Sequence, residues 1–204
     1  MDMRQFLKHV LAYLLRLLQP EAKNPSIILL GDSLVELGNW EQLLNRADFI
    51  NRGIGGDTLS HIQKRMKSLG AIRARIIFIE GGINDFPQSE PDSLFGKYQE
   101  IIAFWQSKQI TPVVVGLVYI SPLAAKTYPF RSDWRGINNQ VSTLNENLKS
   151  FCNAQKIDFI DLNSLLSDSI QLRSEYTTDG VHLTEAAYHI WAGEILRFLN
   201  QYQL

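Results

Sequence analysis

The stretch IILLGDSLVE, residues 27–36, joins a run of aliphatic residues to a glycine, an acid and a hydroxyl. Four consecutive apolar residues that stop at a glycine are typical of a strand buried on both faces, as in a parallel sheet. Gly31 permits a tight turn, and both Asp32 and Ser33 are residue types that cap helices well. The stretch therefore predicts a buried strand followed by a helix, with Ser33 either as a nucleophile or as the cap of that helix.

Apolar runs of the same kind recur along the chain and alternate with helical patterns. This alternation is typical of crossover units around a parallel sheet with helices on both faces. We therefore predict a single three-layer α/β/α domain over residues 21–204, built on a five-stranded parallel sheet. The predicted strands are SIILLG (26–31), DFINRG (48–53), RIIFIEGG (75–82), TPVVVGLVY (111–119) and IDFIDL (157–162), and the predicted helices cover residues 40–46, 58–68, 91–108, 137–155 and 184–202.

The composition is that of an ordinary globular protein. The 204 residues are 45% hydrophobic and 20% charged, with a formal net charge of -1, values far from those of disordered or membrane-spanning chains. A chain without a basic excess is not expected to bind nucleic acid. The lone Cys152 cannot form an internal disulfide, so the fold does not depend on an oxidising compartment and we expect a cytoplasmic location.

Residues 1–20 predict an amphipathic helix ahead of the domain. Their apolar residues recur at helical spacing on one stripe, and Arg4, Lys8 and Arg16 face away from it. The uninterrupted apolar run is too short to span a bilayer, so we expect no stable membrane insertion. We expect the stripe to pack on its own domain or on a second copy in a homodimer, with association at a membrane surface as the less favoured alternative.

Four segments near the predicted sheet carry unusual chemistry. In open α/β sheets, ligands bind beyond the carboxyl ends of the strands, which is where three of these segments begin. They are Gly31-Asp32-Ser33, NRGIGGDT (51–58) and GGIND (81–85), with TDGVHLT (178–184) just before the last helix. The longest irregular stretch, residues 121–136, is also expected to carry function, as long ordered loops often do.

Together these segments contain the parts that acyl transfer requires. Ser33 can serve as nucleophile, and His182 can serve as general base with Asp179 close enough in sequence to orient its ring. The Asn84 amide is a neutral donor that can stabilise an oxyanion. Each of these residues also has a purely structural interpretation as a turn or cap residue, so the case depends on their meeting in space.

In these four segments and their order, the chain closely resembles the SGNH or GDSL family of serine esterases and lipases, particularly the platelet-activating-factor acetylhydrolase branch. The resemblance implies a flavodoxin-like sheet order and a mechanism without a cofactor or a metal. It implies that Ser33 is the nucleophile, His182 the base and Asp179 the carboxylate that orients the imidazole. The Ser33 N–H, the Gly56 N–H and the Asn84 side chain would form the oxyanion hole.

The glycine of the oxyanion hole is chosen by alignment with the family. The segment NRGIGGDT holds glycines at 53, 55 and 56, which lack the spacing of a dinucleotide-binding loop. Alignment through GDT selects Gly56, while Gly55 stays open and Gly53 is less favoured. A residue without a side chain allows the closest approach of a backbone N–H to the developing charge.

We therefore predict a serine esterase that cleaves small carboxylic esters, with short acyl chains, through an acyl-enzyme intermediate. One alternative is a non-catalytic binding module on the same fold, and another is a metal-dependent phosphoesterase that uses hard ligands near the sheet edge. Lysophospholipids, thioesters and acetylated sugars stay open as substrates. The phosphoesterase ligands would be Asp32, Asp57, Asp85, Asp179 and His182, and the residues expected to contact an apolar substrate group, or else to pack the loop, are Phe86, Tyr119 and Trp134.

Overall fold

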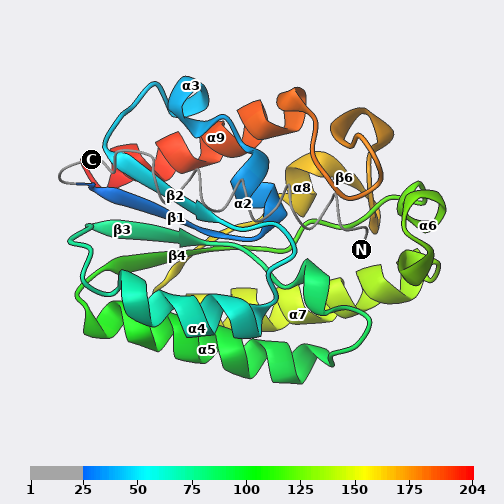
Figure 1. Ribbon diagram of the computed structural model, residues 1–204, viewed down its shortest axis with the longest axis horizontal. Helices are drawn as coiled ribbons and strands as arrows, with labels where there is room; N and C mark the ends of the chain where they lie inside the picture. The colour runs from blue at the N-terminus through cyan, green and yellow to red at the C-terminus, as the bar shows by residue number, and fades with distance from the viewer. Residues whose placement is uncertain (1–24) are drawn as a thin grey trace.

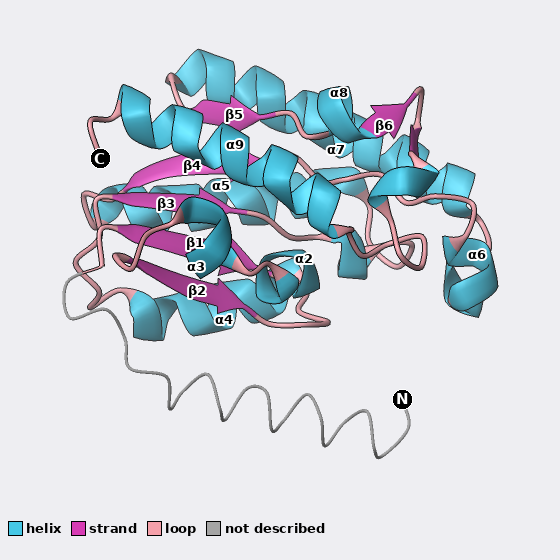
Figure 2. Cartoon of the chain, turned by 90° about the horizontal axis from the view of Figure 1, so that it is seen from above, coloured by secondary structure: helices cyan, strands magenta, loops and turns pink. Residues whose placement is uncertain are grey.

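The computed structural model describes residues 25–204, in which five parallel strands form one sheet between two layers of helices (Figures 1 and 2). The strand order is β2-β1-β3-β4-β5, which is the flavodoxin-like order. The predicted three-layer α/β fold is therefore confirmed. The strands are β1 (Ile27–Gly31), β2 (Phe49–Gly53), β3 (Ile76–Ile79), β4 (Thr111–Val115) and β5 (Asp158–Ile160).

The two faces of the sheet bury alternate residues of each strand. In β1, Ile28 and Leu30 belong to one core cluster, whereas Ile27 and Leu29 belong to the other, as the two-residue period of a strand requires. Both faces are apolar because helices cover both. One face packs against α4 (Leu59–Leu69), α5 (Pro91–Ser107) and α7 (Trp134–Gln155), and the other against α2 (Ser33–Leu37), α3 (Trp40–Leu44), α8 (Asn163–Leu166) and α9 (Glu185–Gln201).

The register of the strands aligns the ends from which the functional segments leave. Gly31 at the end of β1 pairs with Gly53 at the end of β2, and Leu30 pairs with Ile79 at the end of β3. The loops that follow these three strands therefore begin side by side at the carboxyl edge of the sheet. That placement brings the first three predicted segments together.

The structure shortens three of the predicted strands, those over 75–82, 111–119 and 157–162. The run predicted over 111–119 pairs only as far as Val115, because β5 is short and ends at Ile160 opposite it. Beyond this point side chains replace strand pairing, since the Leu117 N–H donates to Asn145 Oδ1 and the Tyr119 N–H donates to Asn163 Oδ1, both at 2.9 Å. The apolar residues over 111–119 indicate that this segment is buried. They do not reveal the distant asparagines that replace strand pairing beyond Val115.

The stretch predicted to be irregular over 121–136 contains short regular elements. These are α6 (Ala124–Thr127) and a 3₁₀ turn, η2 (Pro129–Arg131). Helix α7 begins at Trp134, three residues before the predicted start, because the Asp133 side chain caps it by accepting from the Gly136 N–H at 3.0 Å. Two further elements that the sequence did not predict, β6 (Ser167–Asp168) and β7 (Gln171–Leu172), form a small antiparallel hairpin.

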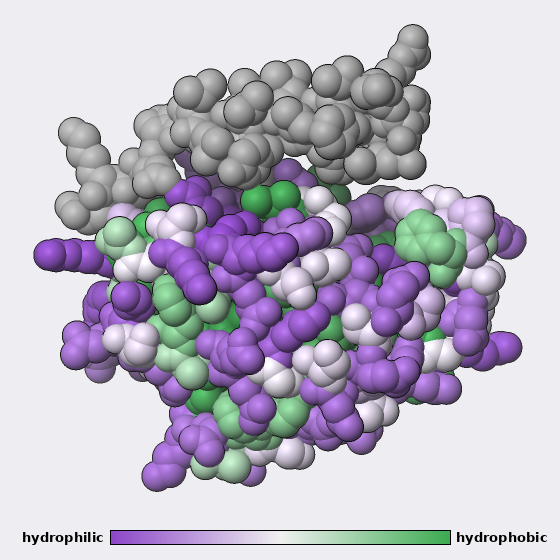
Figure 3. All heavy atoms as spheres, turned by 60° about the horizontal axis from the view of Figure 1, so that its bottom comes forward, coloured by the Kyte–Doolittle hydropathy of each residue, from purple (hydrophilic) through white to green (hydrophobic). Residues whose placement is uncertain are grey.

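The face of the molecule on the α4 and α5 side is largely polar (Figure 3). The face that comes forward when the α4 and α5 side is tilted toward the viewer is mostly hydrophilic, with small separate apolar areas (Figure 3). Among residues 25–204, no helix combines the length and the apolar character needed to cross a membrane. The amphipathic helix predicted over residues 1–20, with its proposed packing partners, lies outside the described residues.

Candidate active site

Ser33 is the first residue of α2 and not its cap. The cap is Asp32, whose side chain accepts a hydrogen bond from the Leu34 N–H at 3.0 Å. The Ser33 hydroxyl is therefore free of the capping role, and its Oγ lies 3.1 Å from His182 Nε2. This distance places a nucleophile and a base within hydrogen-bond reach of each other.

The Asp179 carboxylate holds the other side of the His182 ring. Its Oδ2 lies 2.6 Å from His182 Nδ1, and its Oδ1 accepts from the backbone N–H groups of Val181 and His182 at 2.9 and 2.8 Å. Partial burial pushes the pKa of Asp179 upward, but the hydrogen bonds outweigh it and lower this pKa to about 2. Asp179 is thus ionised at neutral pH and oriented by two backbone donors.

The backbone of the 53–56 turn separates the three candidate glycines. The Gly53 N–H donates to Asn51 Oδ1 at 2.9 Å, and the Gly55 N–H donates to Glu36 Oε2 at 2.7 Å. Gly56 is exposed, adopts a φ of +80°, and its N–H has no acceptor among the described residues. Of the three, Gly56 is the one whose N–H is available to a ligand.

Asn84 follows β3 in a 3₁₀ turn, η1 (Ile83–Asp85). Its Nδ2 donates to the Asp57 carbonyl oxygen at 3.1 Å and lies 3.4 Å from Asp32 Oδ2, while its Oδ1 accepts from Arg131 Nη2 at 3.2 Å. A guanidinium can only donate and a carbonyl can only accept, so both contacts assign the same orientation to the amide. The contact to Asp32 ties Asn84 to the turn that carries Ser33.

A pair of buried acids supports the turn below Ser33. Asp32 and Glu80 are 0% and 1% exposed. Burial and the nearby Asp32 carboxylate raise the pKa of Glu80 well above its usual range, which favours the protonated form of Glu80. Burial also raises the pKa of Asp32, to about 6, against the opposing effect of the Leu34 N–H. The pair therefore carries at most one negative charge close to the nucleophile.

This pairing predicts unequal effects of two substitutions at Glu80. Glu80→Gln keeps the size of the side chain and an uncharged group beside Asp32, so we expect the free energy of unfolding to stay within about 1 kcal/mol of the wild type. Glu80→Ala leaves a cavity at this buried position, so we expect a loss of about 2–4 kcal/mol. Urea unfolding measures both, with the exposed Glu41→Ala as control. Equal losses for glutamine and alanine would contradict the protonated pair.

The sequence does not predict the roles of two residues of the site, and both of them lie in the stretch 121–136. Tyr128 Oη donates to Asp179 Oδ2 at 2.7 Å, and Arg131 contacts Asn84 as described above. The length of the ordered loop is the available signal. Nothing in the local sequence indicates which distant groups these side chains reach.

The predicted substrate residues do not share one exposed surface. Phe86 is 1% exposed and Tyr119 is 9% exposed, and both belong to the core cluster on the α5 and α7 side. Trp134 is half-buried against the same cluster and stacks with Arg135. Burial leaves Phe86 and Tyr119 almost no surface to offer a substrate, and both pack in the core. Contact of these residues with a substrate stays a prediction.

The acidic residues proposed as metal ligands are engaged elsewhere. Asp57 pairs with Arg65 at 2.7 Å, and Asp85 accepts from the Leu59 N–H at 2.9 Å. Over residues 25–204, no three or more His, Cys, Asp or Glu side chains are grouped so that they could hold a metal ion. This arrangement of donors does not fit the phosphoesterase alternative.

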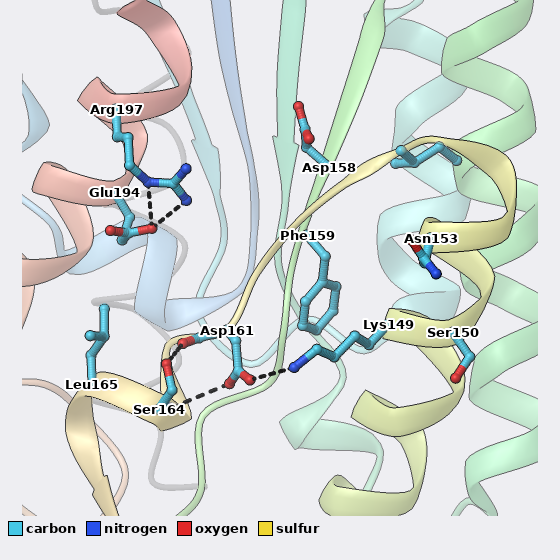
Figure 4. A pocket seen from close by; sticks show the side chains of 11 residues that line it. Lys149, Ser150, Asn153, Asp158, Phe159, Asp161, Ser164, Leu165, Glu194 and Arg197 are labelled. Carbon is cyan, nitrogen blue, oxygen red and sulfur yellow. Dashed lines mark hydrogen bonds and ion pairs between the residues drawn. The ribbon is translucent and has the colours of Figure 1, made fainter. Parts of the chain in front are cut away.

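A groove of about 700 Å³ lies elsewhere on the surface, beside β5 and between α7 and α9 (Figure 4). Four of its charged side chains form two ion pairs: Lys149 Nζ lies 3.3 Å from Asp161 Oδ2, and Arg197 Nη2 lies 2.7 Å from Glu194 Oε2. None of the catalytic candidates lines it. The catalytic candidates therefore lie at the carboxyl edge of the sheet and not in this groove.

Comparison with known proteins identifies a family. A family model described as the GDSL-like Lipase/Acylhydrolase family matches residues 29–190, which include every candidate catalytic residue. Platelet-activating factor acetylhydrolase IB subunit alpha2 of Rattus norvegicus is 28% identical over 174 residues, which cover 81% of this chain and 72% of the relative. The family resemblance predicted from the sequence is confirmed.

Solved structures share the fold at lower sequence identity. A GDSL-like lipase from Bacteroides thetaiotaomicron has a TM-score of 0.78 at 19% identity, covering 95% of this chain and 98% of its own. The M. smegmatis aryl esterase has a TM-score of 0.69 at 18% identity, covering 86% of this chain and 99% of its own.

Proposed function

Since this chain belongs to the GDSL-like lipase/acylhydrolase family and is a carboxylic ester hydrolase, we propose that it cleaves esters of short acyl chains through an acyl-enzyme on Ser33. The observation that carries the proposal is the continuous line of contacts from Ser33 Oγ to His182 Nε2, and from His182 Nδ1 to Asp179 Oδ2, at 3.1 and 2.6 Å. Such a line provides a nucleophile, a base and an orienting carboxylate.

The reaction proceeds in two displacements. Ser33 Oγ attacks the ester carbonyl while His182 Nε2 takes the hydroxyl proton, and the tetrahedral intermediate expels the alcohol, which receives that proton from His182. A water then gives a proton to His182 and attacks the acyl group. The second tetrahedral intermediate breaks its bond to Ser33 Oγ, which takes the proton back from His182, and the carboxylic acid is released. The Ser33 N–H, the Gly56 N–H and the Asn84 amide donate to the oxyanion in both steps.

The surroundings of the triad favour partly apolar substrates. Leu123 and Phe130 are 40% and 59% exposed on the stretch that also carries Tyr128, so they offer apolar surface near the catalytic residues. The relatives are named acetylhydrolase and aryl esterase, which is consistent with a short acyl group or an aromatic alcohol.

One set of measurements tests the proposed function. A p-nitrophenyl alkylphosphonate is expected to abolish activity with a single adduct on Ser33, located by mass spectrometry, and a chelator is expected to leave activity unchanged. Across p-nitrophenyl esters, kcat/KM is expected to be highest from acetate to butyrate. Sensitivity to the chelator without labelling would favour the metal-dependent alternative, and no turnover across ester, thioester, lysolipid and acetyl-sugar substrates would favour a binding module.

Asn84→Ala is expected to lower kcat by about 10²–10³ with little change in KM, because the amide stabilises the oxyanion of the transition state and not the ground-state ester. Steady-state kinetics with p-nitrophenyl acetate measures both constants. The exposed Asn139→Ala on α7 is the matched control. A folded Asn84→Ala protein with wild-type turnover would remove Asn84 from the oxyanion hole.

A further inference from the structure

The stretch Ser121–Asp133, here called the bracing segment, lies beyond the carboxyl ends of the strands, where α6 is seen in Figure 1. Two of its side chains contact different parts of the active site: one contacts Asp179 of the triad, and the other contacts Asn84. Tyr128 and Arg131 are three residues apart in one tight turn, closed by a hydrogen bond from the Arg131 N–H to the Tyr128 carbonyl at 2.8 Å. A rearrangement of this turn therefore moves both side chains.

Tyr128 donates to the oxygen of Asp179 that faces the histidine. Its Oη lies 2.7 Å from Asp179 Oδ2 and 3.5 Å from His182 Nδ1. Burial and the hydrogen bond to Asp179 raise the pKa of Tyr128 to about 12, so the phenol stays a neutral donor at neutral pH. With the two backbone donors on Oδ1, this bond fixes the plane of the carboxylate that orients the imidazole.

Arg131 donates to the amide oxygen of Asn84, the side chain whose NH₂ is proposed to stabilise the oxyanion. The side chain is 3% exposed, and it donates through Nη1 to the Ile83 carbonyl at 3.3 Å and through Nη2 to Asn84 Oδ1 at 3.2 Å. With Oδ1 fixed by a guanidinium, the NH₂ group of Asn84 must point the other way. Arg131 thus opposes the flip that would present an acceptor, instead of a donor, to the reacting carbonyl oxygen.

The burial of Arg131 is hard to explain by stability alone. Its hydrogen-bond acceptors are neutral, and among the described residues it forms no direct ion pair. Burying a guanidinium without a bonded carboxylate is energetically costly. The charges of Asp32 and Asp179 favour the cation and partly offset the cost of burial, and both of these acids belong to the active site.

The bracing segment is also fixed to the turn that carries Asp179. The Ser121 N–H donates to the Gly180 carbonyl at 2.8 Å. A Cβ at Gly180 would lie 2.0 Å from the Ala124 backbone nitrogen, and Gly180 has a φ of +98°. Only glycine permits this close approach, which sets the distance between Tyr128 and the carboxylate.

We propose that Tyr128 and Arg131 are positioning residues, which act through Asp179 and Asn84 and couple the orientation of the triad to that of the oxyanion hole. The inference rests on the proposed serine mechanism. It predicts that neither side chain contributes once its partner has been removed.

Two double-mutant cycles test this prediction, with kcat and KM measured on p-nitrophenyl acetate. Arg131→Met is expected to lower kcat about 10- to 100-fold with KM nearly unchanged, because the Asn84 amide is no longer held with its NH₂ toward the oxyanion. In an Asn84→Ala background, the same substitution is expected to lower kcat by less than about 3-fold. Tyr128→Phe is expected to lower kcat about 3- to 10-fold alone, and by less than about 2-fold in an Asp179→Ala background.

Matched controls separate positioning from general destabilisation. Tyr202→Phe removes a hydrogen bond of the same 2.7 Å length to Asp158, remote from the triad, and Arg135→Met removes an exposed arginine from the first turn of α7. Both are expected to keep wild-type kcat. If Arg131→Met does not fold, as judged by circular dichroism, Arg131→Lys takes its place in the cycle, with a smaller loss that again disappears in the Asn84→Ala background.

The outcomes distinguish this inference from the proposed function. Additive losses in both cycles, or wild-type kcat in the folded single variants, would overturn the positioning roles while phosphonate labelling of Ser33 and wild-type turnover stay intact. Failure of the wild-type enzyme to be labelled or to turn over esters would overturn the serine mechanism itself.

Discussion

Ser33→Ala is expected to lower kcat/KM toward p-nitrophenyl acetate by about 10⁴-fold or more, because no other group can form the acyl-enzyme. The substitution removes one oxygen and leaves the helix cap on Asp32 intact. The melting temperature is therefore expected to change by no more than a few degrees, so that loss of activity is not loss of fold. A pre-steady-state burst of p-nitrophenol, expected in the wild type, should be absent.

The matched control for this experiment is Ser68→Ala on α4, where an exposed hydroxyl donates to a backbone carbonyl. It is expected to keep full activity. More than about 1% residual activity in purified Ser33→Ala protein would contradict the nucleophile assignment. Phosphonate labelling of a different residue would contradict it as well.

The fold could be predicted largely because β1 and the other central strands are apolar along their whole length. Such runs show burial on both faces, and the glycine and polar residues that follow them mark the carboxyl edge of the sheet. The end of β4 could not be predicted in this way, because Asn145 and Asn163, distant in sequence, satisfy the backbone beyond Val115. Apolar patterning reports burial and carries no information on such pairings.

The same limit applies to the candidate site. Ser33, Asn84, Asp179 and His182 could be identified because each lies in a short segment with its own chemical signature. The choice between Gly55 and Gly56 depends on Glu36, which occupies the Gly55 N–H from 19 residues away. The roles of Tyr128 and Arg131 depend on contacts across 51 and 47 residues. Reacting groups are therefore easier to identify from the sequence than the side chains that position them.

Asp179→Asn is expected to lower kcat by about 10⁴-fold, and the hydrogen bonds of the site give the reason. Both backbone donors point at Oδ1, so the asparagine must place its oxygen there and its NH₂ at the Oδ2 position. That NH₂ then donates to His182 Nδ1, which leaves the proton on Nε2. A histidine protonated on Nε2 cannot accept the proton of Ser33, and the comparable substitution in a serine protease costs about 10⁴ in kcat.

Two further measurements make this prediction specific to Asp179. Asp161→Asn, which alters a surface carboxylate paired with Lys149, is expected to keep wild-type kcat. Because the pKa of Asp179 is lowered to about 2, its ionised form stabilises the native state above about pH 4, and this contribution is lost as the pH falls from about 4 toward 2. Urea unfolding is therefore expected to show a smaller acid-induced loss of stability in Asp179→Asn than in the wild type. A loss of kcat below about 10-fold would mean that the two backbone donors and Tyr128 do not fix the orientation of this side chain, and that His182 keeps its reactive tautomer without the carboxylate.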